Sequence, residues 1–329
     1  MKVLIADFLD ETTVEAPILG DRATIEIARA ACEEELGDRP VDADVIILYH
    51  DISRLSALTL NRAERCRGVV RAGVGFNNVD IETAGKLGIV VCNVPDYGTE
   101  EVADHSIMLL LALARKLSPC DRAIRAGGWD YRSALGAPRL RGKTIGIVGC
   151  GRIGAATALR AKALGLDVLI YDPKIPHGVE KALGVGRVHT LAELAERSLF
   201  VSVHCYLDQS TRHLIDAKFF EKLPHGAYLI NTARGPIVDE KALLAALDSG
   251  KISGAGLDVV EIEPLANDRL RKHPNVLLTP HSAFYSVEGF IELRSKTAAE
   301  ALRLIRGEDP LNAVNRDCLV DPRYRRGGR

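Results

Sequence analysis

Three side chains of different chemical type each follow an apolar segment in the second half of the sequence. Arg234, Glu263 and His281 lie a few residues beyond stretches that have the composition of buried strands. A guanidinium can hold a carboxylate through two parallel hydrogen bonds and polarise an adjacent keto oxygen. An imidazole can deliver a proton near neutral pH, and a neighbouring carboxylate stabilises its charged form. If the fold places them at one edge of a sheet, these residue types suit the reduction of a 2-keto acid.

A glycine pattern earlier in the chain indicates where a nucleotide would bind. Gly149-x-Gly151-x-x-Gly154 directly follows the apolar segment 144–148 and opens an alanine-rich helical stretch. In that context the glycines allow a tight turn, close approach of a pyrophosphate and close helix packing, and the helix N-terminus attracts phosphate. Asp172 ends the next predicted strand, near the spacing of about 20 residues typical of the acid that binds an adenosine ribose. Its charge would repel a 2′-phosphate, so the sequence favours NAD over NADP.

Each of these residues also has a purely structural interpretation. Glycines recur in ordinary turns, and a lone Arg, Glu or Asp in a loop is usually a solvated surface group. His281, after Thr279 and Pro280, could be a loop histidine whose hydrogen bonds are satisfied. Cys205 also follows a predicted strand and could be a nucleophile, but no oxyanion-hole motif accompanies it.

Composition excludes several classes of protein. The 43 Lys and Arg residues balance 44 Asp and Glu, so no net field would attract nucleic acid or an anionic membrane. The longest strongly apolar run, 107–114, is far shorter than a bilayer span, and the N-terminus lacks the pattern of a signal peptide. We therefore expect a cytoplasmic protein. Seven cysteines without a C-x-x-C pattern predict neither a disulfide framework nor a metal site.

The elements that must position these residues follow an α/β pattern. Short apolar segments between helical stretches predict a largely parallel sheet over residues 1–97. Its strands are expected at 3–6, 24–27, 45–49, 68–71 and 89–92, with a short helix at 84–87. A helix starting near Thr99 is apolar nearly all round as far as Ala114, which predicts burial on several sides.

Strict alternation of strands and helices begins after a stretch, residues 116–141, that is predicted to be irregular. Strands are expected at 144–149, 167–171, 199–204, 227–231, 253–258 and 276–279, and helices at 152–164, 190–197, 216–222 and 239–248. This order predicts a doubly wound parallel sheet. An amphipathic helix at 287–306 is expected to return to the first domain, and the Arg- and Gly-rich residues 321–329 are predicted to be disordered.

The sequence resembles the D-isomer-specific 2-hydroxyacid dehydrogenases over nearly all of residues 1–318. The most specific segments are 71–80, 148–154, 231–235, 258–264 and 279–281. Within that family it is most similar to the C-terminal-binding-protein branch, through 13–15, 17–19, 49–50 and 284–286.

The resemblance implies two Rossmann-like lobes with doubly wound parallel sheets and a cleft between them that binds the substrate. Residues 1–97 plus 285–320 would be the substrate-binding domain, and residues 98–284 the NAD-binding domain. A homodimer is also implied.

Roles for individual residues follow from the same resemblance. Arg234 would hold the substrate carboxylate and carbonyl, His281 would be the acid/base, and Glu263 would support His281. Backbone groups of Val74 and Gly75 would also bind the carboxylate. Cofactor contacts are implied at Arg152, Ile153, Asp172, Cys205, Thr232 and Asp258.

Two hypotheses about function remain open at the level of sequence. The first is an NAD-dependent dehydrogenase that interconverts a 2-keto acid and a D-2-hydroxy acid. The alternative is an NAD(H)-sensing, corepressor-like binding protein with weak or vestigial activity. Phe284 stands where the animal corepressors carry Trp, so their substrate preference does not transfer directly. Glu263 and Val74 differ from the Gln of formate and the Lys of phosphite dehydrogenases, which disfavours both activities.

Overall fold

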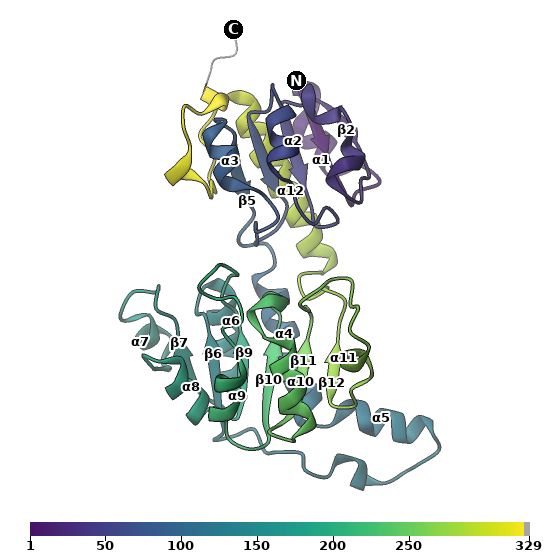
Figure 1. Cartoon of the computed structure of the whole chain (residues 1–329), viewed down its shortest axis with the longest axis vertical. Helices are drawn as coiled ribbons and strands as arrows, with labels where there is room; N and C mark the ends of the chain where they lie inside the picture. The colour runs from purple at the N-terminus through teal and green to yellow at the C-terminus, as the bar shows by residue number, and fades with distance from the viewer. Residues whose placement is uncertain (326–329) are drawn as a thin grey trace. The chain divides into compact units, whose positions relative to one another are not determined.

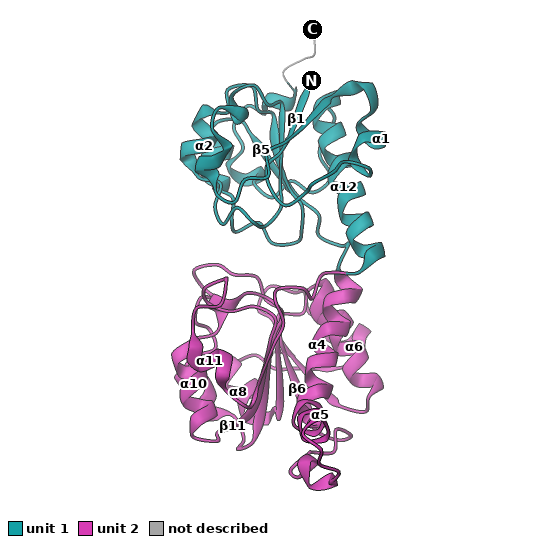
Figure 2. Ribbon diagram, turned by 90° about the vertical axis from the view of Figure 1, so that its right-hand side faces the viewer, with its two compact units in different colours: residues 1–98, 286–329 teal, residues 99–285 magenta. Residues whose placement is uncertain are grey.

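The computed structural model describes residues 1–325, whose backbone separates into two compact units (Figure 2). The first unit comprises Met1–Gly98 and the described chain from Ser286 onward, and the second comprises Thr99–Tyr285. The boundaries expected from the sequence, 97/98 and 284/285, lie one residue from those observed.

The first unit is built on a five-stranded sheet within residues 1–325, and every neighbouring pair of strands is parallel. In spatial order the strands are β2 Thr24–Ile27, β1 Lys2–Ile5, β3 Val45–Leu48, β4 Gly68–Arg71 and β5 Val90–Asn93. The three strands β3, β4 and β5 are buried along their whole length, as expected for strands covered on both faces.

Helices of the first unit include one that returns from the far end of the chain. They are α1 Glu15–Leu19, α2 Ala57–Arg62, α3 Ile81–Lys86 and α12 Val287–Arg306. The helix α12 packs against α1, β3 and β4, and its apolar face includes the buried Leu293 and Leu304. Arg294 lies on this buried face and makes two 2.7 Å hydrogen bonds to the carboxylate of Glu15 on α1. The pair fixes α12 against α1 because each charge depends on the other inside the unit.

The second unit contains a seven-stranded parallel sheet over the described residues. In spatial order its strands are β12 Val276–Leu278, β11 Ile252–Leu257, β10 Ala227–Asn231, β9 Phe200–Val203, β6 Thr144–Val148, β7 Asp167–Tyr171 and β8 Gly186–Arg187. From β6 the chain first adds β7 and β8 on one side and then adds β9 to β12 on the other, so the order of strands changes direction between β6 and β9. This is the arrangement of a doubly wound sheet. The predicted fold class is therefore confirmed.

Helices cover both faces of this second sheet. They are α4 Thr99–Ala114, α5 Leu117–Arg125, α6 Arg152–Ala163, α7 Val179–Leu183, α8 Leu191–Arg197, α9 Ala217–Lys222, α10 Glu240–Asp248 and α11 Asp268–Lys272. Figures 1 and 2 show α4 and α6 on one side of the sheet, with α8 and α10 on the other. The helix α4 approaches β11 closely because Gly256 has no side chain, and a Cβ there would lie 2.9 Å from Cβ of Leu109.

Two expectations about irregular segments were wrong. Residues 116–141, expected to be irregular, contain the helix α5 and a 3₁₀ turn at Tyr131–Ala134. The helix was not predicted because a proline near its start and glycines after its end obscured the helical pattern. Residues 321–325 of the predicted disordered tail pack against the first unit. Tyr324 is 4% exposed and donates to Asp309, while the Arg323 guanidinium donates to three main-chain carbonyls between residues 63 and 66. The rest of that prediction, residues 326–329, lies outside the described residues.

Within residues 1–325, no helix combines the length and apolar character needed to cross a bilayer. The same residues contain no cluster of three or more His, Cys, Asp or Glu side chains arranged to hold a metal ion.

Candidate active site

The glycine loop after β6 is shaped by two close approaches, at Gly149 and Gly154. Gly149 has φ +90°, and a Cβ there would lie 2.5 Å from the amide nitrogen of Cys205. At Gly154, a Cβ would lie 2.1 Å from the carbonyl oxygen of Gly149, so only glycine lets α6 start this close to β6. Gly151 differs, because a Cβ there would meet no atom within 4 Å. The loop therefore leaves open space beside the N-terminus of α6, where the first residues are Arg152 and Ile153.

Asp172 lies beside this loop at the carboxyl end of β7. One of its carboxylate oxygens accepts a 2.8 Å hydrogen bond from the amide of Cys150, and the other accepts one of the same length from the amide of Lys174. The carboxylate therefore holds the glycine loop and stays available at its rim, since each oxygen has a second lone pair. An open glycine turn, a helix N-terminus and this acid fit the adenosine and pyrophosphate groups of NAD.

Arg234 is carried by a turn that follows β10. Asn231 at the end of the strand accepts from the amide of Ala233 at 3.0 Å and donates to the carbonyl of Arg234 at 2.9 Å. The guanidinium itself donates to the carbonyl of Ala233. At the next residue, Gly235, a Cβ would lie 1.8 Å from the carbonyl oxygen of Val260, so glycine allows the loops after β10 and β11 to touch.

Glu263 and His281 form a direct pair. Nδ1 of His281 lies 2.7 Å from one carboxylate oxygen of Glu263, and the other oxygen accepts from the amide of Val260. Because Nδ1 faces the carboxylate, Nε2 is the nitrogen that could exchange a proton with a substrate. Their side chains are about one-third exposed, 32% and 38%, so the pair is reachable from solvent.

Electrostatics favour the ionised form of Glu263. Its partial burial raises the pKa, but the hydrogen bond and charge of His281, together with the charge of Arg234, outweigh burial and hold the pKa below its usual range. Burial raises the pKa of Cys205 to about 12, so this thiol stays protonated and is unsuited to act as a nucleophile.

The backbone of His281 adopts an unusual conformation with φ +53°. A β-carbon makes this left-handed region unfavourable, so the surroundings must hold the residue there. Asp258, 2% exposed, does so: its carbonyl accepts from the His281 amide, and its carboxylate accepts from Thr279 Oγ1 at 2.6 Å and from the amides of Ser282 and Ala283. Asp258 therefore sets the shape of the loop that carries His281.

The structure brings most of the predicted site residues to one edge of the second unit. Strands β10, β11 and β12 are parallel neighbours, so the loops after them lie side by side, as do those after β6, β7 and β9. These six loops, together with the first turn of α6, carry the predicted residues of the second unit, namely Gly149, Gly151, Arg152, Ile153, Gly154, Asp172, Cys205, Thr232, Arg234, Asp258, Glu263 and His281. Val74 and Gly75 lie in the first unit, on the loop after β4, where Asn93 donates to the carbonyl of Val74 at 2.7 Å.

Sequence reasoning missed three residues that support this edge. Asn231 shapes the Arg234 turn, and His105 and Ser106 on α4 bond to Thr279 and Thr232. The signal that could have revealed the last two was their position at the start of the long apolar run of α4, where polar side chains border the buried face of the helix.

Comparisons with known proteins agree with this geometry. Residues 107–283 match the NAD-binding domain of the D-isomer-specific 2-hydroxyacid dehydrogenases. The chain is 36% identical over 315 residues to D-3-phosphoglycerate dehydrogenase of Methanocaldococcus jannaschii, with 96% of this chain and 59% of the relative covered. It is 35% identical over 323 residues to C-terminal-binding protein 1 of Caenorhabditis elegans, covering 94% and 44%. This chain thus spans roughly half the length of these two relatives.

A solved structure extends the comparison to the fold. The D-lactate dehydrogenase of Aquifex aeolicus, complexed with NAD and lactic acid, superposes with a TM-score of 0.85 at 28% identity, covering 95% of this chain and 99% of that one. The chain belongs to the D-isomer-specific 2-hydroxyacid dehydrogenase family. Its cofactor is NAD, as expected from the glycine pattern.

Proposed function

We propose that the chain is an NAD-dependent oxidoreductase that reduces a 2-keto acid to a D-2-hydroxy acid, reversibly. The observation that carries the proposal is the 2.7 Å pair of His281 and Glu263, with the charge of Arg234 acting on Glu263, on the carboxyl edge of an NAD-binding sheet. A cation, a proton donor and its supporting carboxylate are the groups that this reaction requires from a protein.

Each side chain has a separate task in this proposal. Arg234 binds the substrate carboxylate with its forked N–H donors and polarises the neighbouring carbonyl. His281 gives the proton on Nε2 to the developing alkoxide, while Glu263 on Nδ1 stabilises the imidazolium before transfer. Val74 and Gly75 of the first unit contribute backbone groups to the same carboxylate.

The cofactor is held by the loops after β6, β7, β9, β10 and β11. The glycines 149, 151 and 154 with Arg152 and Ile153 bind the pyrophosphate, Asp172 binds the adenosine ribose, and Cys205, Thr232 and Asp258 line the remainder. When bound, the nicotinamide supplies the hydride. Because Asp172 carries a negative charge, NADH is the preferred form over NADPH.

The experiment that tests the proposal is NADH oxidation with a panel of 2-keto acids that differ in side chain, followed by chiral analysis of the product. The expected result is turnover with at least one acid and a product of D configuration. Production of the L isomer, or no turnover with any acid although NADH binds, would overturn it.

A second candidate function rests on the 35% identity to C-terminal-binding protein 1. In this alternative the chain binds NAD(H) and its output is contact with another protein, with little turnover. The two candidates differ in one measurable property, because an NADH sensor binds the nucleotide tightly without oxidising it in the presence of any keto acid.

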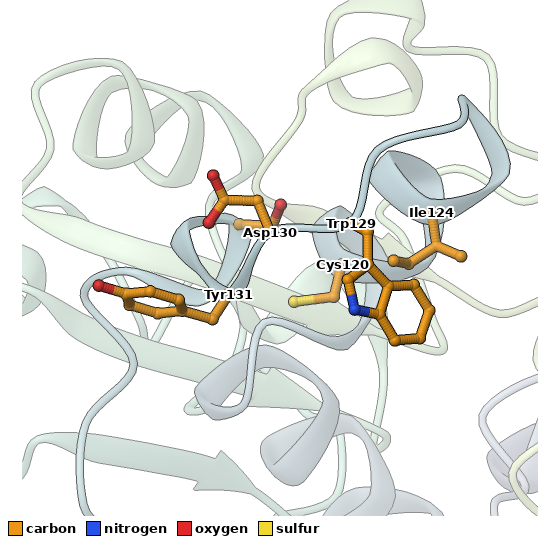
Figure 3. A pocket seen from close by; sticks show the side chains of 6 residues that line it. Cys120, Ile124, Trp129, Asp130 and Tyr131 are labelled. Carbon is orange, nitrogen blue, oxygen red and sulfur yellow. The ribbon is translucent and has the colours of Figure 1, made fainter.

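The protein is further proposed to be a homodimer. Residues 117–135 of the second unit expose five large apolar side chains, Leu117, Ile124, Trp129, Tyr131 and Leu135, of which Trp129 is 88% and Tyr131 83% exposed. A pocket of about 230 Å³ lies in this segment. Figure 3 shows Trp129 and Tyr131 among the side chains that line it. Exposed apolar side chains concentrated in one segment are typical of an interaction surface, and a second copy of the chain is the occupant proposed here.

A further inference from the structure

The helix α4 carries a histidine that bonds to the loop of His281. Nε2 of His105 lies 2.9 Å from Oγ1 of Thr279, and 3.7 Å from the carboxylate of Asp258. Thr279 gives its own hydroxyl proton to Asp258, so its oxygen is an acceptor towards His105. His105 therefore donates from Nε2, and its ring is only 15% exposed. The bond connects α4 to a residue two positions before His281.

The next residue on α4 makes the equivalent connection to the other catalytic loop. Oγ of Ser106 lies 2.8 Å from Oγ1 of Thr232 and donates its proton to the carbonyl of Val102. Since a hydroxyl has one proton, Thr232 donates to Ser106. Thr232 lies two positions before Arg234, as Thr279 does before His281.

We infer that His105 and Ser106 are positioning residues, which fix His281 and Arg234 respectively through the two threonines. The inference rests on the proposed function, because it assigns the two bonds to two different tasks in keto acid reduction. His281 transfers the proton, so the His105 bond serves the chemical step. Arg234 holds the carboxylate, so the Ser106 bond serves substrate binding.

The loops that carry His281 and Arg234 need support from a neighbouring element. His281 is held at φ +53°, a conformation that relaxes unless bonds from outside the loop oppose it. The helix α4 provides a rigid support because it packs on β10 and β11 through buried leucines, among them Leu109 and Leu113. A rigid element holds catalytic groups more accurately than a loop can by itself.

The test compares variants at three consecutive residues of one helix. His105→Leu removes the donor, His105→Gln restores an N–H at a similar reach, and Ser106→Ala removes the acceptor for Thr232. Asp104→Ala is the matched control, because this exposed neighbour forms an ion pair with Arg160 and bonds to neither catalytic loop. Steady-state kinetics for the keto acid give kcat and KM separately. Amide hydrogen exchange of the unliganded protein measures how well each of the two loops is held in place.

Loss of one hydrogen bond corresponds to about a fivefold effect. His105→Leu should lower kcat about fivefold with KM within twofold, and His105→Gln should recover most of kcat. Ser106→Ala should raise KM about fivefold with kcat nearly unchanged, and Asp104→Ala should change neither. Equal changes in both parameters for both variants, no change in either, or failure of His105→Gln to restore kcat would overturn the inference.

The exchange measurement separates this inference from the proposed function. Amides of residues 282–285 should exchange faster in His105→Leu, and those of residues 233–235 faster in Ser106→Ala, with the other loop unchanged. This result needs no turnover, so it stands even if the wild-type chain reduces no keto acid. Unchanged or uniformly faster exchange in both loops would contradict the positioning role.

Discussion

Glu263 is ionised more readily than an ordinary glutamate because His281 and Arg234 lie nearby. The 2.7 Å hydrogen bond also orients the ring, because the carboxylate holds Nδ1 and leaves Nε2 to face the substrate. Since the pKa of Glu263 is lowered, its charge is present at neutral pH and is lost only as the pH falls through that lowered value.

The first prediction follows for Glu263→Gln. The amide keeps the size of the side chain but loses the charge, so kcat for keto acid reduction should fall with turnover retained, and the acidic limb that protonation of Glu263 gives the wild-type profile, at a pH below the usual range of a glutamate, should disappear. The pH profile of the reduction is the measurement, and Asp104→Ala serves as a surface control. An unchanged profile would mean that Glu263 does not support the acid.

Asp172 carries the second prediction, because it both holds the glycine loop and bears the charge at its rim. Wild-type protein should prefer NADH over NADPH by more than about a hundredfold in kcat/KM. Asp172→Asn keeps an oxygen that can accept from Cys150, so it should relax the preference while retaining stability. Asp172→Ala should lose both the preference for NADH and part of the stability, because it removes the charge and the acceptor for the Cys150 amide. Equal use of the two cofactors by the wild type would contradict the role given to this charge.

At the scale of elements, two glycines of the loop after β6 should differ in their effects on stability and on NADH binding. Gly154→Ala places a Cβ 2.1 Å from the Gly149 carbonyl, so it should lower the melting temperature and NADH affinity together. Gly151→Ala meets open space, and its φ of −73° suits alanine, so the melting temperature should hold while NADH binding weakens at least tenfold. Calorimetry and NADH fluorescence titration measure the two effects. Equal loss of stability in both variants would refute the distinction.

The contact between α1 and α12 gives a prediction about stability. Glu15 is fully buried and Arg294 nearly so, and removal of one partner leaves a buried charge without compensation. Arg294→Met should lower the free energy of unfolding by about 3–5 kcal/mol, and the double variant Glu15→Gln/Arg294→Met should recover part of the loss. Chemical denaturation checks both. A single variant as stable as the wild type would show that this pair is unimportant.

The elements that position the site were largely predictable, and the reasons are physical. Parallel strands buried on both faces, such as β10, read as continuous apolar runs, and the glycine pattern marks the start of α6. The α5 helix was missed because its proline and the glycines near it obscured the helical pattern. The packing of Tyr324 was missed because it depends on tertiary contacts that no local pattern records. The threonine bonds to His105 and Ser106 join residues more than 100 positions apart, so periodicity could not reveal them.

At the scale of the whole molecule, the exposed aromatic side chains of residues 117–135 predict self-association. Sedimentation of the wild type should give a dimer, and Trp129→Glu with Tyr131→Glu should shift the equilibrium towards monomer. Leu58→Glu is the matched control, since Leu58 is exposed and apolar but belongs to the first unit. A monomeric wild type, or a double variant as dimeric as the wild type, would contradict this assignment.

The central claim is that His281 supplies the proton in keto acid reduction. Its most direct test is single-turnover reduction of the best keto acid of the panel by NADH-loaded protein, in wild type and in His281→Asn. We expect the variant to bind NADH within twofold of the wild type and to react about a hundred- to ten-thousandfold more slowly. A single-turnover rate within threefold of the wild type would show that another group provides the proton.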